Sequence, residues 1–198
     1  MKTAPYLDRM HDELLRYGPL LEEEWLKLAH ILKPVRFNKG EYFVQIGDVP
    51  NKLGYISSGI FRVFCITEKG EDWILAFREE NRFLGAFSPF LESKPSWYGI
   101  QALEPSLLLC ISLNEYNRLI AGHPCWANLS RKYLETLFVE KEKREREFLS
   151  ENAETRYLNF KKAYPGIEQR VHQYHIASYL GITSVALSNI RRGLQQKK

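Results

Sequence analysis

The residues whose types and spacing most clearly indicate a function lie between Gln173 and Arg192, in the sequence QYHIASYLGITSVALSNIRR. Apolar side chains recur there at helical spacing on both sides of Gly181, and glycine readily adopts the positive φ of a tight turn between two helices. Ala177, four residues earlier, is small enough for the two helices to cross closely. This spacing is typical of a helix-turn-helix, whose second helix lies in the major groove of DNA. An ordinary helical hairpin is the alternative that the segment alone leaves open.

The second helix of this unit carries polar side chains that packing does not require. We expect it to begin at Thr183, a good N-cap residue. Asn189 can pair with adenine, Ser188 can bond to either kind of base edge, and Val185 can meet a thymine methyl group. Cationic side chains nearby would hold phosphates, which position a protein on DNA without specifying the sequence. The predicted base-reading residues are Ser184, Val185, Ser188 and Asn189, and the predicted phosphate contacts are Arg170, Thr183, Arg191, Arg192 and Lys197.

The positive charge of the chain is concentrated at the same end. Residues 155–198 contain eight Lys or Arg and one acidic residue, Glu168, which gives +7, whereas residues 1–154 carry −3. A phosphate-binding module needs such a concentration of basic charge. A merely soluble basic tail, the alternative, does not explain why the charge coincides with the two-helix pattern. Double-stranded DNA is therefore the predicted partner.

Other side-chain chemistries have little support. Cys65, Cys110 and Cys125 form neither a close pair nor a CxxC motif, which disfavours a metal site, an iron–sulfur site and a disulfide framework. No histidine lies between His30 and His123, whereas a metal centre inside a barrel would need several ligands there. No Ser–His–Asp motif is evident. We expect a protein that is not an enzyme, with no catalytic residues, no metal and no cofactor.

The apolar runs and the N-terminus predict a cytoplasmic protein. No apolar run approaches the roughly 18 residues of a membrane span, so no membrane partner is expected. The N-terminus lacks the basic-then-apolar layout of a secretion signal. Together with the cysteine usage, these features indicate a reducing compartment.

The rest of the chain must position the two-helix unit, and its pattern changes twice. Residues 6–33 combine apolar residues at helical spacing with the acidic run Glu22–Glu24, which suits a helix start. From Val35 to Leu113, short aromatic and β-branched runs such as LGYISSGIFRVFCIT alternate with Gly, Asn, Asp and Pro. Strands at this spacing predict a β-sandwich or a jelly-roll barrel. The helical period then returns.

A long helix is expected from about Cys125 to Ser150, and Ser150 is expected to cap the helix that follows. Its first half repeats apolar residues at spacings of three and four, and its second half, EKEKRERE at 140–147, sets opposite charges four residues apart. Such a charged run is most often a solvated helix face. A half-apolar helix of this length between two domains nevertheless favours pairing with its own copy in a homodimer. The predicted dimer contacts are Trp126, Leu129, Tyr133 and Leu137.

The order of these elements resembles the Crp/Fnr family of bacterial transcription regulators, in which a jelly-roll sensor, a long helix and a helix-turn-helix follow one another. In the sensor the resemblance rests on Gly40, Gly47 and Gly59 in NKGEYFVQIGDVPNKLGYISSGIFRVF, and on RFLGAF at 82–87, where the family's phosphate-binding cassette begins. At the C-terminus it rests on IASYLGITSVALSNIRR. It implies a dimeric DNA-binding regulator with operator half-sites about one DNA turn apart.

The resemblance implies an α+β fold with three parts. These are a cyclic-nucleotide-binding-like β jelly-roll barrel at 1–124, a long dimerisation helix at 125–150 and a small helix-turn-helix domain at 151–198. The β-hairpin wing that usually follows the reading helix is expected to be small or missing, because six residues follow Arg192. The family's usual Arg, Glu and Arg are replaced in that helix by Ser184, Val185 and Asn189, so the family's target sequence does not carry over.

The cassette departs from the family's cyclic-nucleotide binders. Those proteins place a glutamate after the cassette glycine and an Arg-Ser or Arg-Thr pair about ten residues later, whereas this chain has Ala86 and then Ser96–Trp97. A buried phosphate without a guanidinium partner costs several kcal/mol. We therefore expect no control by a cyclic nucleotide, and a small apolar or aromatic effector if the pocket is not filled by its own side chains. The expected lining is Phe83, Leu84, Gly85, Ala86, Phe87, Ser96, Trp97 and Tyr98.

Two other functions are compatible with the sequence. The chain could be a ligand-binding or protein-interaction module with a jelly-roll fold that has lost DNA binding, which the missing wing motivates. It could also be a true cyclic-nucleotide-responsive regulator, if Arg78 or Arg82 replaced the missing arginine. Affinity for random duplex DNA tests the first alternative, and a thermal shift with cyclic AMP tests the second.

Overall fold

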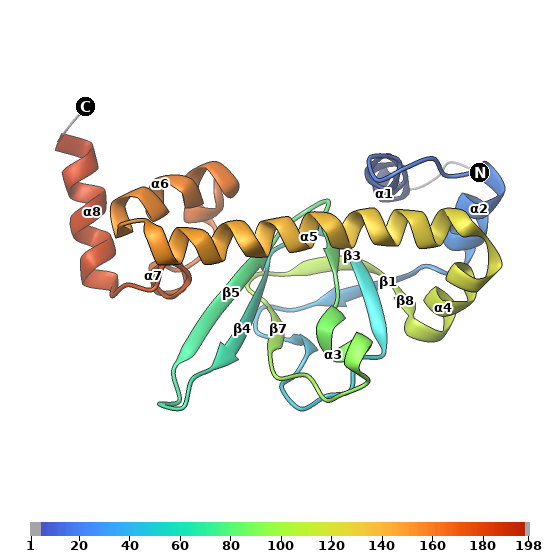
Figure 1. Ribbon diagram of the computed structural model, residues 1–198, viewed down its shortest axis with the longest axis horizontal. Coiled ribbons are helices and arrows are strands. Elements are labelled where there is room, and N and C mark those ends of the chain that lie inside the picture. Colours follow the sequence, from blue (N-terminus) through green and yellow to red (C-terminus); the bar gives the residue numbers. More distant parts are fainter. Residues whose placement is uncertain (1–4, 197–198) are drawn as a thin grey trace. The chain divides into compact units, whose positions relative to one another are not determined.

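The computed structural model describes residues 5–196, which divide into two compact units (Figure 1). The first, which we call the sensor unit after the family resemblance, comprises the chain up to Val63 together with Phe77–Phe138. The C-terminal unit comprises Phe64–Ala76 and the chain from Val139 onward. The C-terminal unit therefore includes parts of two strands that the sequence assigned to the barrel, as well as the helices that follow.

Two helices precede the strands. α1 spans Pro5–Leu15 and α2 spans Glu22–Ile31. The acidic residues Glu22, Glu23 and Glu24 occupy the first turn of α2, where carboxylates interact favourably with the helix dipole. The predicted start of this helix is confirmed.

The strands form two four-stranded sheets, with the orders β1-β8-β3-β6 and β2-β7-β4-β5, which confirms the predicted jelly-roll core. β8 pairs antiparallel with both β1 and β3, and β2 pairs antiparallel with β7. The strands are β1 Lys33–Phe37, β2 Tyr42–Val44, β3 Lys52–Ser58, β4 Phe61–Ile66, β5 Asp72–Arg78, β6 Phe83–Leu84, β7 Gly99–Ala102 and β8 Ser106–Ser112.

The first of these sheets is apolar on both faces. Tyr55 of β3 lies opposite Leu109 of β8, and the next pair along, Ile56 and Leu108, points to the other face because side chains alternate along a strand. All four residues are buried. This is why the β8 sequence SLLLCIS reads as an almost continuous apolar run rather than an alternating one.

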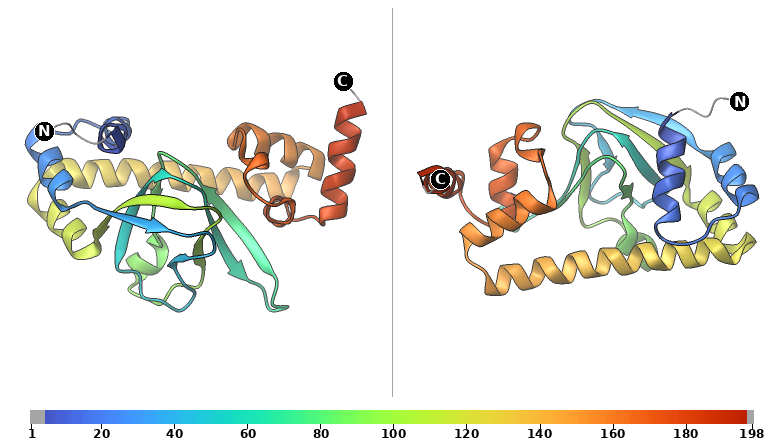
Figure 2. Two further views of the ribbon diagram at one scale, coloured as in Figure 1. Left: turned by 180° about the vertical axis from the view of Figure 1, so that it is seen from behind. Right: turned by 90° about the horizontal axis from the view of Figure 1, so that it is seen from above.

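Helices cover one of these faces. α1, α2 and the first half of α5 lie together against β3 and β8, as the views in Figure 2 show. α3 spans Phe87–Glu92, and α4 spans Leu113–Gly122 and begins with a capping box between Ser112 and Glu115. The side chains of α1, α2 and α5 that meet the two strands form an apolar cluster of the sensor unit.

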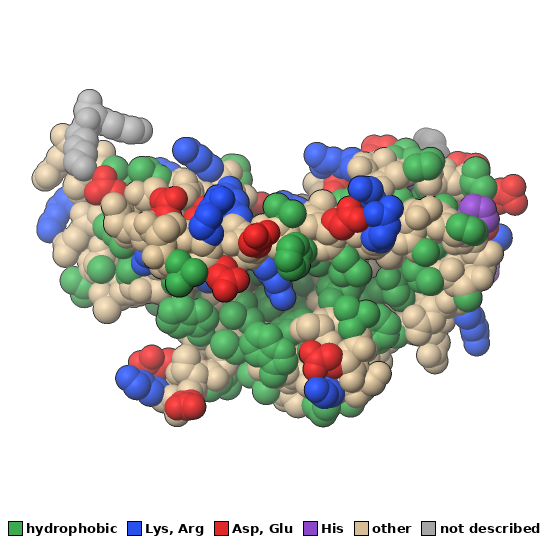
Figure 3. All heavy atoms as spheres, viewed as in Figure 1, with side chains coloured by type: hydrophobic (Ala, Val, Ile, Leu, Met, Phe, Trp, Pro, Cys, Tyr) green, Lys and Arg blue, Asp and Glu red, His purple; other side chains and the backbone are tan. Residues whose placement is uncertain are grey.

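The long helix α5 spans Pro124–Ser150, within one residue of its predicted bounds. Charged side chains of both signs, interspersed with hydrophobic ones, follow its exposed face (Figure 3). The predicted cap at Ser150 is wrong: Ser150 is the last residue of α5, and its hydroxyl donates to the Arg146 carbonyl at 2.8 Å. The next helix is capped by Asn152, whose extended backbone lets its side-chain oxygen accept from the Thr155 amide at 2.9 Å.

The remaining helices belong to the C-terminal unit. α6 spans Ala153–Ala163, a short 3₁₀ turn covers Ile167–Gln169, and α7 and α8 span Gln173–Leu180 and Ser184–Gln196. Over residues 5–196, no helix combines the length and the apolar character that crossing a membrane requires.

Candidate functional site

The turn between α7 and α8 has the geometry that the sequence predicts. Gly181 ends α7 in the left-handed conformation, with φ 67°. Its amide donates to the Ser178 carbonyl at 3.1 Å. A Cβ at this position would lie 2.7 Å from Cε1 of Phe148, so the backbone conformation favours glycine and a larger residue would also displace the Phe148 ring.

A small apolar core holds α8 against α7. Leu187 of α8 and Ile176 and Ala177 of α7 are buried. α8 begins as predicted, because the Thr183 hydroxyl accepts from the Ala186 amide at 3.1 Å and the Thr183 carbonyl accepts from the Leu187 amide at 3.0 Å. The hydroxyl satisfies an amide that has no partner within the helix, so Thr183 acts as the helix cap.

The predicted base-reading residues lie on the opposite, exposed side of α8. Ser184, Val185, Ser188 and Asn189 are all exposed, and Val185 retains 70% of its accessible surface. Their spacing of one and four residues places them on one face of the helix. The side-chain oxygen of Asn189 accepts from Arg192 at 3.0 Å. The structure therefore brings these four residues together with one predicted phosphate-binding arginine.

The other predicted phosphate contacts are arranged differently. Arg170 and Thr183 are exposed, whereas Nε of Arg191 lies 3.9 Å from a carboxylate oxygen of Glu168. Lys197 lies outside the described residues. Arg191 thus shares its charge with an acid of the same unit, and Arg192 is the more available cation on α8.

Glu168 also organises the neighbouring helix. It accepts a hydrogen bond of 2.7 Å from the Tyr157 hydroxyl. Burial and this carboxylate raise the pKa of Tyr157 to about 12. The only acidic residue among positions 155–198 therefore has a structural role within the unit and lies beside α8 without belonging to its exposed face.

The residues that attach α7 to strand β5 within the C-terminal unit were not identified from the sequence. The Ser178 hydroxyl accepts from the Ile74 amide at 3.0 Å and donates to the Asp72 carbonyl at 2.8 Å. One guanidinium nitrogen of Arg144 donates to the carbonyls of Ile74 and Tyr179, at 2.9 Å each, and the guanidinium stacks 3.7 Å from the centre of the Tyr179 ring. Strand β5 is thereby tied to the first helix of the two-helix unit.

Arg144 belongs to the charged run that was expected to be a solvated helix face. It is half-buried, and its hydrogen bonds go to backbone carbonyls far away in the sequence. Arg156 acts in a similar way, donating to the Leu180 carbonyl at 3.2 Å and the Glu151 carbonyl at 2.6 Å. Contacts to backbone atoms leave no pairing pattern in the sequence, so spacing could not have identified them.

The residues predicted to line the sensor pocket lie in different environments. Phe83 and Phe87 line a cavity of about 90 Å³ in the sensor unit. Leu84 and Ala86 are buried but do not line that cavity, and a Cβ at Gly85 would lie 2.6 Å from a methyl carbon of Leu53.

The second part of the predicted lining is also dispersed. Ser96 is buried and its hydroxyl donates to the Tyr98 carbonyl at 2.7 Å, whereas Trp97 keeps 55% of its surface exposed. Burial raises the pKa of Tyr98. Ser96 thus uses its hydroxyl within its own loop.

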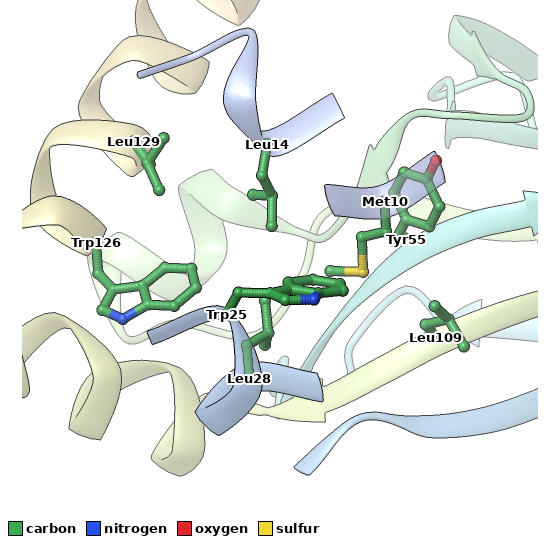
Figure 4. Close-up of a cluster of buried hydrophobic side chains, with 8 residues drawn as sticks. All are labelled: Met10, Leu14, Trp25, Leu28, Tyr55, Leu109, Trp126 and Leu129. Atoms are coloured by element: carbon green, nitrogen blue, oxygen red, sulfur yellow. The ribbon is translucent and has the colours of Figure 1, made fainter. Parts of the chain in front are cut away.

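The cavity lies on the helix-covered face of the sheet rather than between the sheets. α1, α2, α4 and α5 contribute to its wall together with β3 and β8. Figure 4 shows the buried hydrophobic side chains in this part of the unit. They are Met10, Leu14, Trp25, Leu28, Tyr55, Leu109, Trp126 and Leu129, all of which except Trp25 line the cavity.

The apolar repeat on α5 that was assigned to a dimer contact packs inside the chain. Trp126, Leu129 and Tyr133 are buried in the sensor unit, and the Tyr133 hydroxyl donates to the Phe83 carbonyl at 2.9 Å. These three side chains are therefore not available to a second copy, while Leu137 is half-buried. The repeat indicated burial correctly, but the buried face meets the chain's own sheet and helices.

No group of three or more His, Cys, Asp or Glu side chains is placed to hold a metal ion in the part of the chain that the structure describes. Cys65, Cys110 and Cys125 are free thiols. Burial raises the pKa of Cys110 to about 11, which keeps this thiol protonated at neutral pH.

Residues 34–123 match the family model of the cyclic nucleotide-binding domain. This match covers the strands from β1 to β8 and helices α3 and α4. No curated protein sequence matches the chain. The barrel of the sensor unit is thus similar in sequence to a known domain family.

Solved structures share the fold over most of the chain. FixK2 from Bradyrhizobium japonicum aligns with a TM-score of 0.73 at 15% identity, over 84% of this chain and 86% of its own. The c-di-GMP responsive global regulator CLP from Xanthomonas campestris aligns with a TM-score of 0.71 at 14% identity, over 88% and 92%. A protein from Eubacterium rectale described as a transcriptional regulator of the Crp/Fnr family aligns with a TM-score of 0.68 at 17% identity, over 92% and 88%.

Proposed function

We propose that this chain is a dimeric transcription regulator of the Crp/Fnr type that reads DNA with α8. The observation that carries the proposal is the exposed polar face of α8, held in place by buried Leu187 in the part of the chain that carries a net charge of +7. An exposed helix face with small polar and amide side chains can enter the major groove, while nearby cations hold phosphates. The fold shared with regulators over most of their length supports the same function.

In this proposal Asn189 reads a base and Arg192 holds both Asn189 and a phosphate. The hydrogen bond from Arg192 to Asn189 limits the orientations of the amide before DNA arrives. Val185, with most of its surface exposed, offers a methyl pair to a thymine. Ser184 and Ser188 complete the proposed base-reading face, and Arg170, Thr183 and Arg191 are the further proposed phosphate contacts.

The dimer is proposed to form through the exposed face of α5 rather than through its buried repeat. Phe138 and Leu149 keep 67% and 82% of their surface exposed. They lie about three helical turns apart and therefore on the same face. Large apolar side chains this exposed on a charged helix are well suited to contact a second copy of the helix. The charged residues between Phe138 and Leu149 can then pair with opposite charges on that copy.

The sensor unit is proposed to respond to a small apolar effector and not to a cyclic nucleotide. Ala86 and Ser96–Trp97 stand where cyclic-nucleotide binders of the family carry charged partners for the ribose and the phosphate. These three side chains are uncharged and supply no cation to a phosphate, and Ser96 already donates its hydroxyl to the Tyr98 carbonyl. A thermal shift of several degrees with cyclic AMP would contradict this part of the proposal.

DNA binding is tested with the full chain, a sequence selected from random duplexes, and a salt titration. Asn189→Ala should weaken binding to the selected sequence about tenfold while leaving random duplex binding unchanged, since a good base contact discriminates by about 1–3 kcal/mol. Arg192→Ala should weaken both and lower the salt dependence by about one counterion. Gln195→Ala, an exposed change on the same helix, is the matched control. Absence of binding to any duplex at low salt contradicts the proposal and favours a module that has lost DNA binding.

The dimer is tested separately by its mass at micromolar concentration. Phe138→Asp combined with Leu149→Asp should convert a dimer into a folded monomer. Lys143→Asp changes an exposed residue of the same helix and should leave the dimer intact. A monomeric mass for the unchanged protein, or a dimeric mass for the double variant, contradicts pairing through this face.

A further inference from the structure

The cavity on the helix-covered face of the sensor sheet has a chemically uniform wall. Its volume is about 90 Å³, and the surface that faces it is almost entirely apolar. An engineered apolar cavity of about 150 Å³ in another protein stays free of water and takes up benzene or xenon. The space here therefore suits a ligand no larger than about one ring.

The polar atoms of the surrounding aromatic residues are used by other partners. The Tyr17 hydroxyl donates to Glu13 at 2.9 Å, the Tyr55 hydroxyl to the side chain of Asn81 at 2.9 Å, and Nε1 of Trp126 to Glu24 at 2.8 Å. Burial raises the pKa values of Tyr17 and Tyr55 to about 12, so both phenols stay neutral. The wall of the cavity is therefore formed by the apolar parts of these rings.

The rings are arranged to accept another ring. Phe83 and Tyr133 meet edge to face with centroids 5.3 Å apart, and Tyr17 meets Tyr133 in the same way at 5.4 Å. Tyr17 and Phe83 are also edge to face, at 6.3 Å. Aromatic rings prefer this arrangement because the electron-rich face of one ring attracts the electropositive edge of the next. A ligand with its own ring can join this set, and an aliphatic ligand of equal size lacks that interaction.

We propose that this cavity is a binding site for a small, uncharged, single-ring aromatic molecule, formed by helices α1, α2, α4 and α5 against strands β3 and β8. An anionic ligand is excluded, because the wall offers no cation and an unpaired charge is costly to bury. Of the cassette residues, Phe83 and Phe87 line this cavity, whereas Leu84 and Ala86 are buried without lining it. The ligand would be the effector of the proposed regulator, and in that respect the site rests on the proposed function.

The proposal is tested by calorimetric titration of the full chain with benzene, without DNA, so that it can fail while DNA binding stands. We expect saturable binding of benzene and at least 100-fold weaker binding of benzoate, which has the same ring and a negative charge. Methyl signals of Leu14 and Leu129 should shift on binding, and those of Leu158 and Leu194 in the C-terminal unit should not. Absence of saturable binding, or equal binding of benzoate, would overturn the proposal.

Variants locate the site. Ser130 lines the cavity from α5, so Ser130→Phe should fill the space and weaken benzene binding at least tenfold while leaving the melting temperature unchanged or higher. Leu119→Phe fills it from α4 and serves if the first variant does not fold. Asn128→Phe adds the same ring to the exposed side of α5 and should leave binding unchanged. Unchanged binding in folded filled variants places benzene elsewhere and contradicts the site.

Discussion

The two units of this protein are stabilised by different kinds of contact. In the sensor unit, buried aromatic and aliphatic side chains pack against both faces of a sheet, and the polar ends of its aromatic residues bond to partners around the cluster. In the C-terminal unit, the side chains of Arg144, Arg156 and Ser178 bond to backbone atoms of other segments. Both units have a buried apolar core, and the C-terminal unit adds charged and polar donors aimed at backbone carbonyl groups.

This difference separates the two tasks that we propose. An apolar wall with its polar atoms already satisfied can hold a neutral ligand, because nothing in it requires water or a counter-charge. Hydrogen bonds to backbone atoms fix the position of α7 whatever side chains β5 carries. The exposed face of α8 is therefore not needed to hold the helices together. Each of the following substitutions removes contacts from one of the two units.

The largest effect is expected for Leu129→Asp. Leu129 is 3% exposed in the apolar cluster, so a carboxylate there would be buried without a partner and should cost about 5 kcal/mol of unfolding free energy. We expect the sensor unit to unfold, measured by circular dichroism and thermal melting. Asn128→Asp, on the exposed side of the same turn, should be nearly neutral. A folded monomer with an unchanged melting temperature would show instead that Leu129 acts only between subunits.

The second effect tests the C-terminal unit. Arg144→Ala removes two charge-assisted hydrogen bonds and the stacking on Tyr179, and should cost about 3 kcal/mol. The amide of Ile74, which donates to Ser178 in the same contact, should then exchange its hydrogen about 100-fold faster. Arg146→Ala removes an exposed arginine two residues away and is the control. Equal protection of Ile74 in both variants would rule out the anchoring role of Arg144.

The features that could be predicted from the sequence are those that depend on apolar packing and on backbone conformation. Periodicity located α5 within one residue and the strands of the barrel, because apolar burial leaves a repeat of 3.6 or 2 residues in the sequence. Gly181 marked its turn because its backbone conformation is nearly specific to glycine. Periodicity could not say what covers an apolar face, and so Trp126 and Leu129 were assigned to a second copy although they pack on the chain's own sheet.

The contacts that escaped prediction join side chains to backbone atoms. Any residue supplies a carbonyl, so nothing in the sequence near Ile74 marks it as the acceptor for Arg144. The sensor cavity escaped for a related reason. Its wall comes from several helices and strands far apart in the sequence, and of the residues expected around a pocket only Phe83 and Phe87 belong to it.

A smaller effect is expected for removing the charge of Glu24, a buried carboxylate beside the apolar cluster. Glu24 is buried, pairs with Lys27 and accepts from Nε1 of Trp126, and these hydrogen bonds lower its pKa. A lowered carboxyl pKa adds stability above the ordinary glutamate pKa of about 4.3, and this stability is lost as the pH falls through the lowered value. Glu24→Gln should therefore cost about 1–2 kcal/mol at pH 7, and the cost should shrink as the pH falls below the ordinary glutamate pKa.

Denaturant unfolding of Glu24→Gln at pH 7 and at pH 3 measures this difference. Glu23→Gln, an exposed neighbour in the same helical turn, is the control and should show little change at either pH. A penalty for Glu24→Gln that persists undiminished at pH 3 would mean that the shape of the side chain matters at this position and its charge does not.

The smallest effect is expected for removing one ring hydroxyl, which tests whether the hydroxyl groups of the cavity rings influence ligand binding. Tyr133→Phe removes the hydroxyl that donates to the Phe83 carbonyl and keeps the ring, so it should cost about 1 kcal/mol of unfolding free energy. Tyr116→Phe makes the same change in another ring that lines the cavity and serves as the control. Benzene binding should be unchanged in both variants, because the rings that face the ligand are intact. A loss of binding in Tyr133→Phe alone would show that this hydroxyl, by fixing the Tyr133 ring against Phe83, sets the shape of the site as well as the stability of the unit.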